Sequence, residues 1–363
     1  MENNTYHPDG ISKKLIDALR SFSAEAEKIK SLHSEQLAII YEQGWFKLFV
    51  PKIYGGLELS LPEALKMEEA LAWVDGSLGW TVTLCSGANW FVGFIEKEIA
   101  KNIFTDTKVC LAGSGKPSGT AKIMNEGYEI TGHWNYATGS VHATVFTANC
   151  LIEKDGAIVQ NEDGSPMIKA FLLLKEEVTI HKKWDYIGMV ATSSNSFEVK
   201  AVKVPSNRVF IIDKKHSVLS TAIYQYPFLH FAEATLAVNS AGMAFRFIEL
   251  YKNYQRDNPR EIDLTMRLQL KETEDLFKNI RQNFYAAIEE SWKAHCANDS
   301  TSALKMEILS QISRAMATTA RKLVDELYPY CGLAAADSSS EINRVWRNFH
   351  TASQHPLLLS YTR

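Results

Sequence analysis

The sequence predicts a mainly α-helical α+β fold, with a β domain between two helical domains. Apolar residues recur every three or four positions over residues 10–105, which is the spacing of amphipathic helices. They alternate with polar residues over 106–212, as in β-strands, and return to helical spacing over 213–363. We therefore expect an N-terminal helical domain (1–105), a β-barrel or sandwich (106–212) and a C-terminal four-helix bundle (213–363).

The N-terminal block is expected to contain helices on both sides of a loop. The string "VPKIYGG" interrupts the helical pattern with one proline and two glycines. The pattern restarts at "SLPEALKMEEALAWVDGSLGW", where Ser60 suits an N-cap and Pro62 the first turn. Glu63, three residues after Ser60, completes the spacing of a capping box.

The middle block is expected to form about six to eight short strands. The segments "YEITGHW", "TVFTANCLI", "IKAFLLLKE" and "SNSFEVKAVKV" are rich in β-branched and aromatic residues. Turn-forming strings such as "NEG", "EDGSP" and "PSN" separate them.

In the third block, three long amphipathic segments within 230–328 are each long enough for six or more helical turns, which is typical of an antiparallel bundle.

Composition excludes several classes of function. A net charge of −3 and a pI near 6.4 leave no basic surplus for nucleic acid or anionic lipid. No apolar run is long enough to cross a bilayer, and the polar N-terminal stretch predicts a cytoplasmic protein. The five cysteines lie far apart without a CxxC pair, so we expect buried thiols and no metal site.

Three strings, in this order, resemble one family of enzymes. They are "GWFKLFVPKIYGGLELSLPEALKMEEALAWVDGSLGW", "HWNYATG" and "WDYIGMVATSSNSFEVKAVKVPSNRVF". With the helical–β–helical order, they resemble the acyl-CoA dehydrogenase superfamily of flavoproteins over nearly the whole chain. The resemblance implies the fold of that superfamily, a flavin cofactor and an oxidoreductase activity.

The string "NYATGS" is the first candidate for flavin contact. The resemblance implies that the Thr138 hydroxyl bonds the edge of the flavin ring near N5 and that Tyr136 covers one ring face. A flat, half-apolar ring suits an aromatic neighbour with a few placed polar groups, and Gly139 would allow close backbone approach. Taken alone, the string is also typical of a strand that ends in an aromatic pair and an ordinary turn.

Two further stretches are candidates for holding the cofactor. In "CLAGSGKPSGTA" (110–121) the resemblance implies a loop that offers backbone amides to the flavin, with Ser114 and Ser118 on its phosphate side. In "GMVATSS" (188–194) it implies that Thr192 and Ser193 reach the phosphate or the ring. A surface loop and ordinary strand-end capping are the alternative interpretations of these stretches.

The expected catalytic base departs from the dehydrogenase pattern. Where most acyl-CoA dehydrogenases carry a glutamate near the C-terminus, this chain has "WRNFHTASQH", and the position falls at or beside His355. Some members place the glutamate on the first helix of the bundle. Glu233 lies one residue from that place, which is about 100° of rotation on a helix.

The expected phosphate anchor is also missing. FAD-binding members carry Arg-x-x-Phe-Gly after the same helix, whereas this chain reads "YKNYQRDNPREIDL". Arg256 is not in the matching position, so the resemblance favours FMN over FAD, or a reduced flavin that is held only transiently.

In both departures the chain resembles one branch of the superfamily, the monooxygenases that receive reduced flavin from a separate reductase. In that branch His355 would lie over the flavin, where it would hydrogen-bond a flavin hydroperoxide or take a proton from the substrate; a surface histidine is the alternative. Such chemistry needs a dry pocket. The aromatic residues that could supply its walls are Trp80, Trp90, Tyr136, Tyr224, Phe228 and Phe231.

We therefore predict the oxygenase component of a two-component flavin monooxygenase that acts on a small aromatic or similar organic molecule. His355 and Thr138 are its expected catalytic residues, and a homotetramer and a separate flavin reductase are its expected partners. One alternative is an FAD-dependent acyl-CoA dehydrogenase with Glu233 as base. The other is a homologue that binds flavin or another ligand without turnover.

Overall fold

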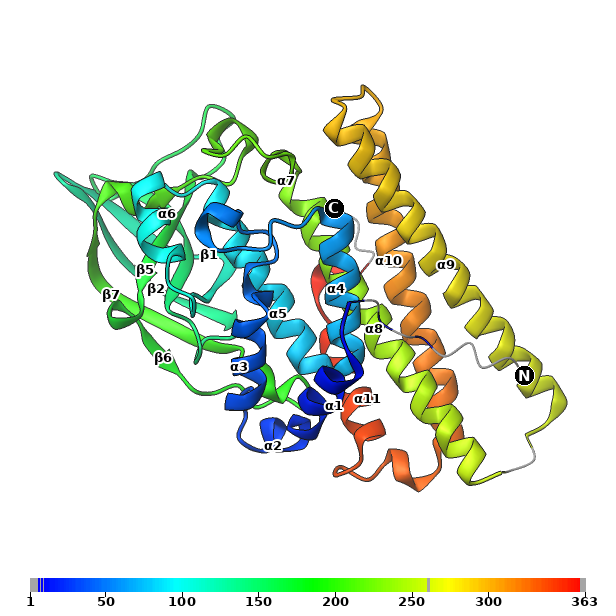
Figure 1. Ribbon diagram of the computed structural model, residues 1–363. Coiled ribbons are helices and arrows are strands. Elements are labelled where there is room, and N and C mark those ends of the chain that lie inside the picture. The colour runs from blue at the N-terminus through cyan, green and yellow to red at the C-terminus, as the bar shows by residue number, and fades with distance from the viewer. Residues whose placement is uncertain (1–5, 7, 9, 260–261, 360–363) are drawn as a thin grey trace.

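The computed structural model describes residues 6, 8, 10–259 and 262–359, and it has the predicted order of helices, strands and helices (Figure 1). The sheet occupies one side of the molecule and three long helices the other, with helices of the N-terminal block between them. The expected mixed fold, mainly helical with a central β domain, is therefore confirmed.

The N-terminal block contains a series of short and medium helices. They are α1 (Lys13–Ser21), α2 (Ser23–Lys28), α3 (Ser34–Glu42), α4 (Leu61–Val74), α5 (Gly76–Asn89) and α6 (Lys97–Phe104). Helix α4 begins after Ser60, whose backbone N–H donates to the Glu63 carboxylate at 2.9 Å, as the capping-box spacing predicts. Almost every residue of α5 is buried, because this helix is covered from several sides.

The β block forms one eight-stranded sheet with the order β6-β7-β2-β1-β3-β5-β8, and β4 pairs with β3. Its strands are β1 (Leu111–Met124), β2 (Gly127–Ala137), β3 (Val145–Lys154), β4 (Ala157–Ile158), β5 (Ile168–Leu174), β6 (Thr179–His181), β7 (Asn195–Val204) and β8 (Val209–Phe210). The sheet has its own apolar core around Trp134, Phe146, Phe171 and Phe197.

The stretch 110–121 is expected as a loop, but its residues 111–121 belong to the long strand β1, so that expectation is wrong. Its register against β3 shifts between Ser114 and Gly119, so the intervening residues bulge out of the ladder. Gly119 packs under the Trp134 ring, where an added Cβ would lie 2.2 Å from a ring carbon. The glycines and serines of this stretch therefore form part of a bulged strand.

The C-terminal block consists of long helices that lie side by side (Figure 1). They are α8 (Phe228–Asp257), α9 (Leu264–Cys296) and α10 (Ser302–Leu327), and the shorter helices of this block are α7 (Ala222–Gln225) and α11 (Glu341–Ala352). Helix α4 also packs along α8, because Gly242 leaves no Cβ between them; one would lie 2.3 Å from the Glu69 carbonyl oxygen. The bundle thus shares a core with the N-terminal block.

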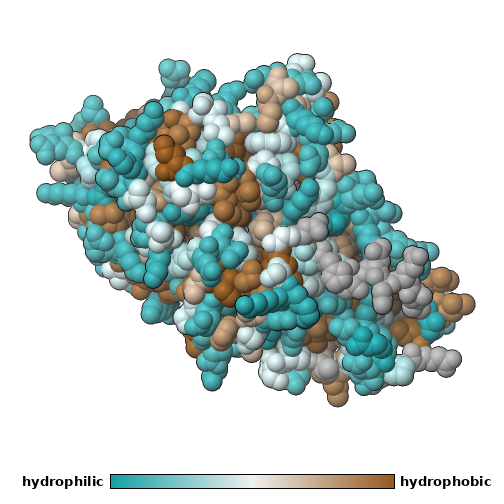
Figure 2. All heavy atoms as spheres, in the orientation of Figure 1, coloured by the Kyte–Doolittle hydropathy of each residue, from teal (hydrophilic) through white to brown (hydrophobic). Residues whose placement is uncertain are grey.

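Polar residues cover most of the face in Figure 2, with apolar residues in scattered patches. Within the described ranges, no helix is both long and apolar enough to span a membrane, and no group of three or more histidine, cysteine or acidic side chains could hold a metal. The cysteines are free thiols; Cys296 is exposed and the other four are buried.

Candidate functional site

The turn after β2 holds Thr138 at the boundary between the sheet and α5. Thr138 is only 6% exposed, and Gly139 has a φ of +76°, which favours glycine. A Cβ at Gly139 would lie 2.6 Å from the Cys85 sulfur of α5, so the turn is pressed against this helix. The Gly139 N–H donates to the Thr192 carbonyl at 2.9 Å, which ties the turn to the 188–194 loop.

Three hydroxyl groups form a continuous chain at this junction. The Thr138 and Ser194 hydroxyl oxygens lie 2.8 Å apart, and those of Ser194 and Thr192 lie 2.7 Å apart. The Thr192 hydroxyl then donates to the Met189 carbonyl at 2.7 Å. Ser194 and Thr192 are buried, so water does not compete for these bonds.

The 188–194 loop is fixed to α11, although the two are far apart in sequence. Asn348 Oδ1 accepts a 2.6 Å hydrogen bond from the Met189 N–H, and the Asn348 side chain is buried. Gly188 lies directly against the backbone of α11, because a Cβ there would be 2.0 Å from the Arg347 carbonyl oxygen. Met189 and Ser193 both have positive φ, so the loop holds a backbone that needs such anchors.

Tyr136 belongs to an exposed aromatic cluster beside the turn. Its side chain is 63% exposed, and its ring meets Trp184 and Tyr186 edge-on. Trp184 stacks on Tyr186 with ring centroids 4.0 Å apart, and its indole N–H donates to the Met189 carbonyl at 2.8 Å. The cluster therefore offers aromatic surface to a ligand next to the Thr138 hydroxyl.

His355 lies at the start of a short helical turn (Pro356–Leu358) after α11. Burial lowers its pKa to about 4, so the ring is neutral at neutral pH. The Leu357 N–H donates to Nδ1 at 3.3 Å, which assigns the ring hydrogen to Nε2. In this tautomer His355 can donate a hydrogen bond from Nε2. It could accept a proton only at Nδ1, which already accepts the Leu357 N–H.

Helix α5 connects His355 with the Thr138 turn. The Trp80 ring meets the His355 ring edge-on at 6.0 Å between centroids. Five residues later, the Cys85 thiol donates to the Thr138 carbonyl at 3.7 Å. Thr81, which follows Trp80, lies beneath Gly139. The two expected catalytic residues therefore border the same short stretch of α5, which is the central geometric feature of this site.

The expected aromatic walls mainly pack against each other. Trp90 stacks with Phe231 and Phe228, at centroid distances of 5.2 and 5.6 Å, and its N–H donates to the Ile223 carbonyl at 3.0 Å. Tyr224 is buried and donates its hydroxyl to the Phe49 carbonyl at 2.6 Å. Phe228, at 38% exposure, is more accessible than Trp90, Tyr224 and Phe231, which are buried.

Glu233 points into the bundle, toward α10. Its carboxylate accepts from Arg314 at 2.9 Å and from the Ser310 hydroxyl. The His230 ring nitrogen lies 2.7 Å from the same hydroxyl, so these side chains form one polar network, in which Glu233 and Ser310 are buried. This engagement makes Glu233 an ion-pair partner of the bundle, and a substrate proton would have to compete with Arg314 for it.

The three serines expected to contact the cofactor make hydrogen bonds outside the Thr138 hydroxyl chain. Ser114 is half-buried in β1, and exposed Ser118 donates to the Lys116 carbonyl at 3.3 Å. Ser193 is buried and donates its hydroxyl to the Lys30 carbonyl at 2.8 Å. Among the hydrogen bonds of the described residues, none joins these three hydroxyls to that of Thr138.

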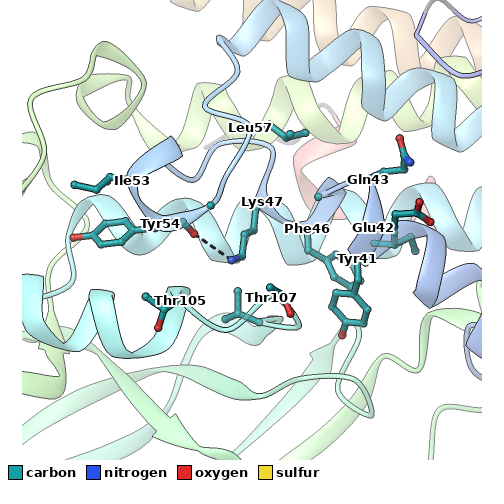
Figure 3. Close-up of a pocket in the computed structure, with 14 residues that line it drawn as sticks. Tyr41, Glu42, Gln43, Phe46, Lys47, Ile53, Tyr54, Leu57, Thr105 and Thr107 are labelled. Carbon is teal, nitrogen blue, oxygen red and sulfur yellow. Dashed lines mark hydrogen bonds between the residues drawn. The ribbon is translucent and has the colours of Figure 1, made fainter.

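Two cavities in the described part of the chain are lined by neither Thr138 nor His355. One, of about 370 Å³, is lined by Tyr41, Lys47, Tyr54 and Thr105 (Figure 3). The Lys47 ammonium group in this cavity has a structural role, because it donates hydrogen bonds to the Phe104 carbonyl at the end of α6 and to the Tyr54 carbonyl. The other, of about 620 Å³, is lined by residues that include Val141, Trp184 and Asn195.

Sequence reasoning missed Ser194, Asn348 and Trp184. Ser194 continues the hydroxyl run of "ATSSN", and Asn348 lies inside "WRNFH", so both are visible as polar residues in strings that carry the resemblance. Their partners lie 56 and 159 residues away. Trp184 precedes the same loop, but no local pattern distinguishes its aromatic stack from a core contact.

The residues beside the turn fit a flavin ring. The exposed Tyr136–Tyr186–Trp184 cluster supplies aromatic surface, and Thr138 supplies a hydroxyl whose other bond is already made inside the protein. Gly139 leaves the turn without a side chain that would project from it. A half-apolar tricyclic ring needs this combination of flat contact and few, fixed polar groups.

Comparison with known proteins gives the same fold. Residues 227–359 match the model of the acyl-CoA dehydrogenase C-terminal domain. The chain is 21% identical over 361 residues to the flavin-dependent monooxygenase, oxygenase subunit HsaA, of Rhodococcus jostii, covering 94% of this chain and 92% of that protein. It is 23% identical over 353 residues to an indole-3-acetate monooxygenase of Pseudomonas putida, covering 95% and 89%.

Solved structures superimpose over almost the entire chain. The HsaA monooxygenase from M. tuberculosis has a TM-score of 0.87 at 21% identity, covering 95% of this chain and 91% of that chain. XiaF from Streptomyces sp., in complex with FADH2 and glycerol, has a TM-score of 0.77 at 20% identity and the same coverage. TdsC from Paenibacillus sp. A11-2, with FMN and indole, has a TM-score of 0.73 at 20% identity, covering 94% and 91%. The chain thus has the fold of the acyl-CoA dehydrogenase superfamily and, over almost its whole length, is similar to flavin-dependent monooxygenases of that fold.

Proposed function

We propose that this protein is a flavin-dependent oxidoreductase, the oxygenase component of a two-component monooxygenase that acts on a small aromatic or similar organic molecule. The observation that carries the proposal is that Thr138 and His355 both contact the same stretch of α5, in a chain similar along 94% of its length to an oxygenase subunit. The partners follow from this assignment: a small-molecule substrate and a separate flavin reductase.

The chain's own side chains have distinct roles in this proposal. Tyr136, with Tyr186 and Trp184, would cover one face of the flavin ring, and Thr138 would bond its edge. When bound, the reduced flavin would supply two of the four electrons that reduce dioxygen; the substrate, which gains one oxygen atom, would supply the other two, and the second oxygen atom becomes water. His355 would hold an oxygen-bearing group through its Nε2–H, because the assigned tautomer donates at that atom. Trp80 would keep water away from this side of the site, because its ring packs on the imidazole.

FMN is the proposed flavin. Arg256 lies at the end of α8 with its side chain 71% exposed and pairs with Asp257, so it is not built into a phosphate site in this chain. Without a fixed guanidinium group to bind its phosphates, the adenine half of FAD adds little to the binding free energy. Anaerobic calorimetry with reduced FMN and reduced FAD tests this: a lower Kd for FMN supports it, and a clear FAD preference contradicts it.

The family also suggests a homotetramer assembled through the helical bundles, in the cytoplasm. Exposed apolar residues on α9 and α10 support an interface there; they are Leu264, Leu268, Leu276, Leu304 and Ile308. Sedimentation at several protein concentrations measures the assembly, and a monomer at micromolar concentration would contradict it.

The decisive experiment is reconstitution with reduced flavin. The purified protein is loaded anaerobically with reduced FMN, mixed with isotopically labelled dioxygen, and screened against phenols, indoles and amino sugars. Incorporation of one labelled oxygen atom into a product supports the proposal. Reduction of bound oxidised flavin by an acyl-CoA without oxygen would instead establish a dehydrogenase, and failure to bind any flavin would favour a ligand-binding homologue.

A further inference from the structure

The hydroxyl chain beneath Thr138 has a fixed direction, which follows from counting hydrogens. A hydroxyl group has one hydrogen to donate, and a carbonyl oxygen has none. The chain ends on the Met189 carbonyl, so Thr192 must donate its only hydrogen there, at 2.7 Å. The bond between Thr192 and Ser194 can then be made only by the Ser194 hydrogen.

The same count of hydrogens fixes the direction of the Thr138 hydroxyl hydrogen. Because Ser194 donates to Thr192, the 2.8 Å bond between Ser194 and Thr138 must use the Thr138 hydrogen. The Thr138 hydroxyl therefore points its hydrogen into the protein and leaves its lone pairs to a ligand. Thr138 acts toward the site as a hydrogen-bond acceptor.

The carbonyl at the end of the chain is held in place by further hydrogen bonds. The Met189 carbonyl also accepts the Trp184 indole N–H at 2.8 Å and the Thr192 backbone N–H at 3.1 Å. The Met189 N–H is itself held by Asn348. Turning the Thr138 hydrogen toward a ligand would leave one buried hydroxyl contact without a hydrogen, which costs about 1 kcal/mol and corresponds to roughly a fivefold change in affinity.

The redox states of a flavin differ at the atoms that such an acceptor detects. The ring nitrogen N5 carries only a lone pair when the flavin is oxidised, and it carries a hydrogen when the flavin is reduced. An acceptor hydroxyl meets the reduced N–H favourably and opposes the oxidised lone pair. A hydroxyl that was free to rotate would serve both states equally.

We propose that Ser194 and Thr192 are positioning residues that orient the Thr138 hydroxyl and make the site prefer reduced over oxidised flavin. This inference rests on the proposed function, because it requires a flavin edge at Thr138. Ser194 and Thr192 would act on the flavin only through Thr138, and they would favour its release once it is oxidised. A protein that receives reduced flavin from a separate reductase needs such a release.

The test is the ratio of the Kd values for oxidised and reduced FMN, measured by calorimetry or fluorescence, the reduced form anaerobically. In Ser194→Ala the Thr138 hydrogen is released, so oxidised FMN should bind about fivefold more tightly while reduced FMN is almost unchanged. In Thr138→Val, which keeps the shape, reduced FMN should bind several-fold more weakly while oxidised FMN is almost unchanged. Ser194→Thr should restore the wild-type ratio.

Ser140→Ala is the matched control, since Ser140 is buried in the same turn but donates to the Ser193 carbonyl, outside the chain. Its ratio should stay within about twofold of the wild type. A wild-type protein that binds neither form contradicts the proposed function. A wild type that binds flavin while Ser194→Ala and Thr138→Val keep its ratio contradicts only the hydroxyl-chain inference, and Thr138→Val alone decides it if Ser194→Ala does not fold.

Discussion

Asn348 Oδ1 accepts a 2.6 Å hydrogen bond from the backbone N–H of Met189, across 159 residues of sequence. The bond joins helix α11, which leads to His355, with the loop whose hydroxyl groups hold Thr138. One buried amide therefore fixes the relative position of the two expected catalytic residues.

Asn348→Ala should lower both stability and flavin affinity. It leaves the Met189 N–H buried without its partner, which costs about 1–3 kcal/mol. The free energy of unfolding in urea and the Kd for reduced FMN measure the two effects. Asn348→Asp keeps the acceptor oxygen and should recover most of the flavin affinity; if both variants bind flavin like the wild type, the anchor has no role in the site.

His355→Ala should remove product formation and leave flavin binding intact. The ring provides an Nε2–H on the α5 side of the site, and loss of such a positioned group typically costs about 10²–10⁴ in rate. Product yield per reduced flavin and the Kd for reduced FMN are measured in parallel. His216→Ala, on a half-exposed surface histidine, is the matched control. Unchanged product yield in His355→Ala would exclude this residue from the chemistry.

Stability should fall as the pH drops below 6.5. Burial lowers the pKa of both His355 and His142 to about 4 from an ordinary value of 6.5, with Lys175 contributing at His142. Between these values the unfolded chain binds protons that the folded chain excludes, so the stability present above pH 6.5 is lost toward pH 4. Each histidine should cost roughly 2 kcal/mol between pH 7 and pH 5.

Urea unfolding of the wild type and of His142→Gln with His355→Asn checks this. Carboxylate titration is common to both proteins, so only the difference between their pH slopes reports the histidines. The double variant should lose distinctly less stability on acidification. Equal slopes would mean that neither ring stays neutral in the folded protein.

Gly139→Ala should destabilise the fold and weaken flavin binding. The position has a φ of +76°, and the new Cβ would lie 2.6 Å from the Cys85 sulfur, so both backbone strain and overlap oppose it. A cost of about 2 kcal/mol or more is expected. Gly115→Ala, where a Cβ meets nothing within 4 Å, is the control and should leave thermal unfolding almost unchanged. A neutral Gly139→Ala would show that the turn can move away from α5.

The sequence alone determined the order of helices and strands, the N-cap of α4 at Ser60 and the turn that contains Thr138. These features depend on the spacing of neighbouring residues, which a linear pattern records. It did not determine that 110–121 continues a strand, because a bulge and a loop use the same glycines and serines.

Only the tertiary structure decided the hydrogen-bond partners of the site. The Thr138–Ser194 and Met189–Asn348 bonds join residues 56 and 159 positions apart, and Glu233 is directed to Arg314 by the packing of α8 on α10. The tautomer of His355 likewise follows from one backbone N–H in the folded chain. A hydroxyl or imidazole can donate or accept, and its role is set by its three-dimensional neighbours, which local periodicity does not encode.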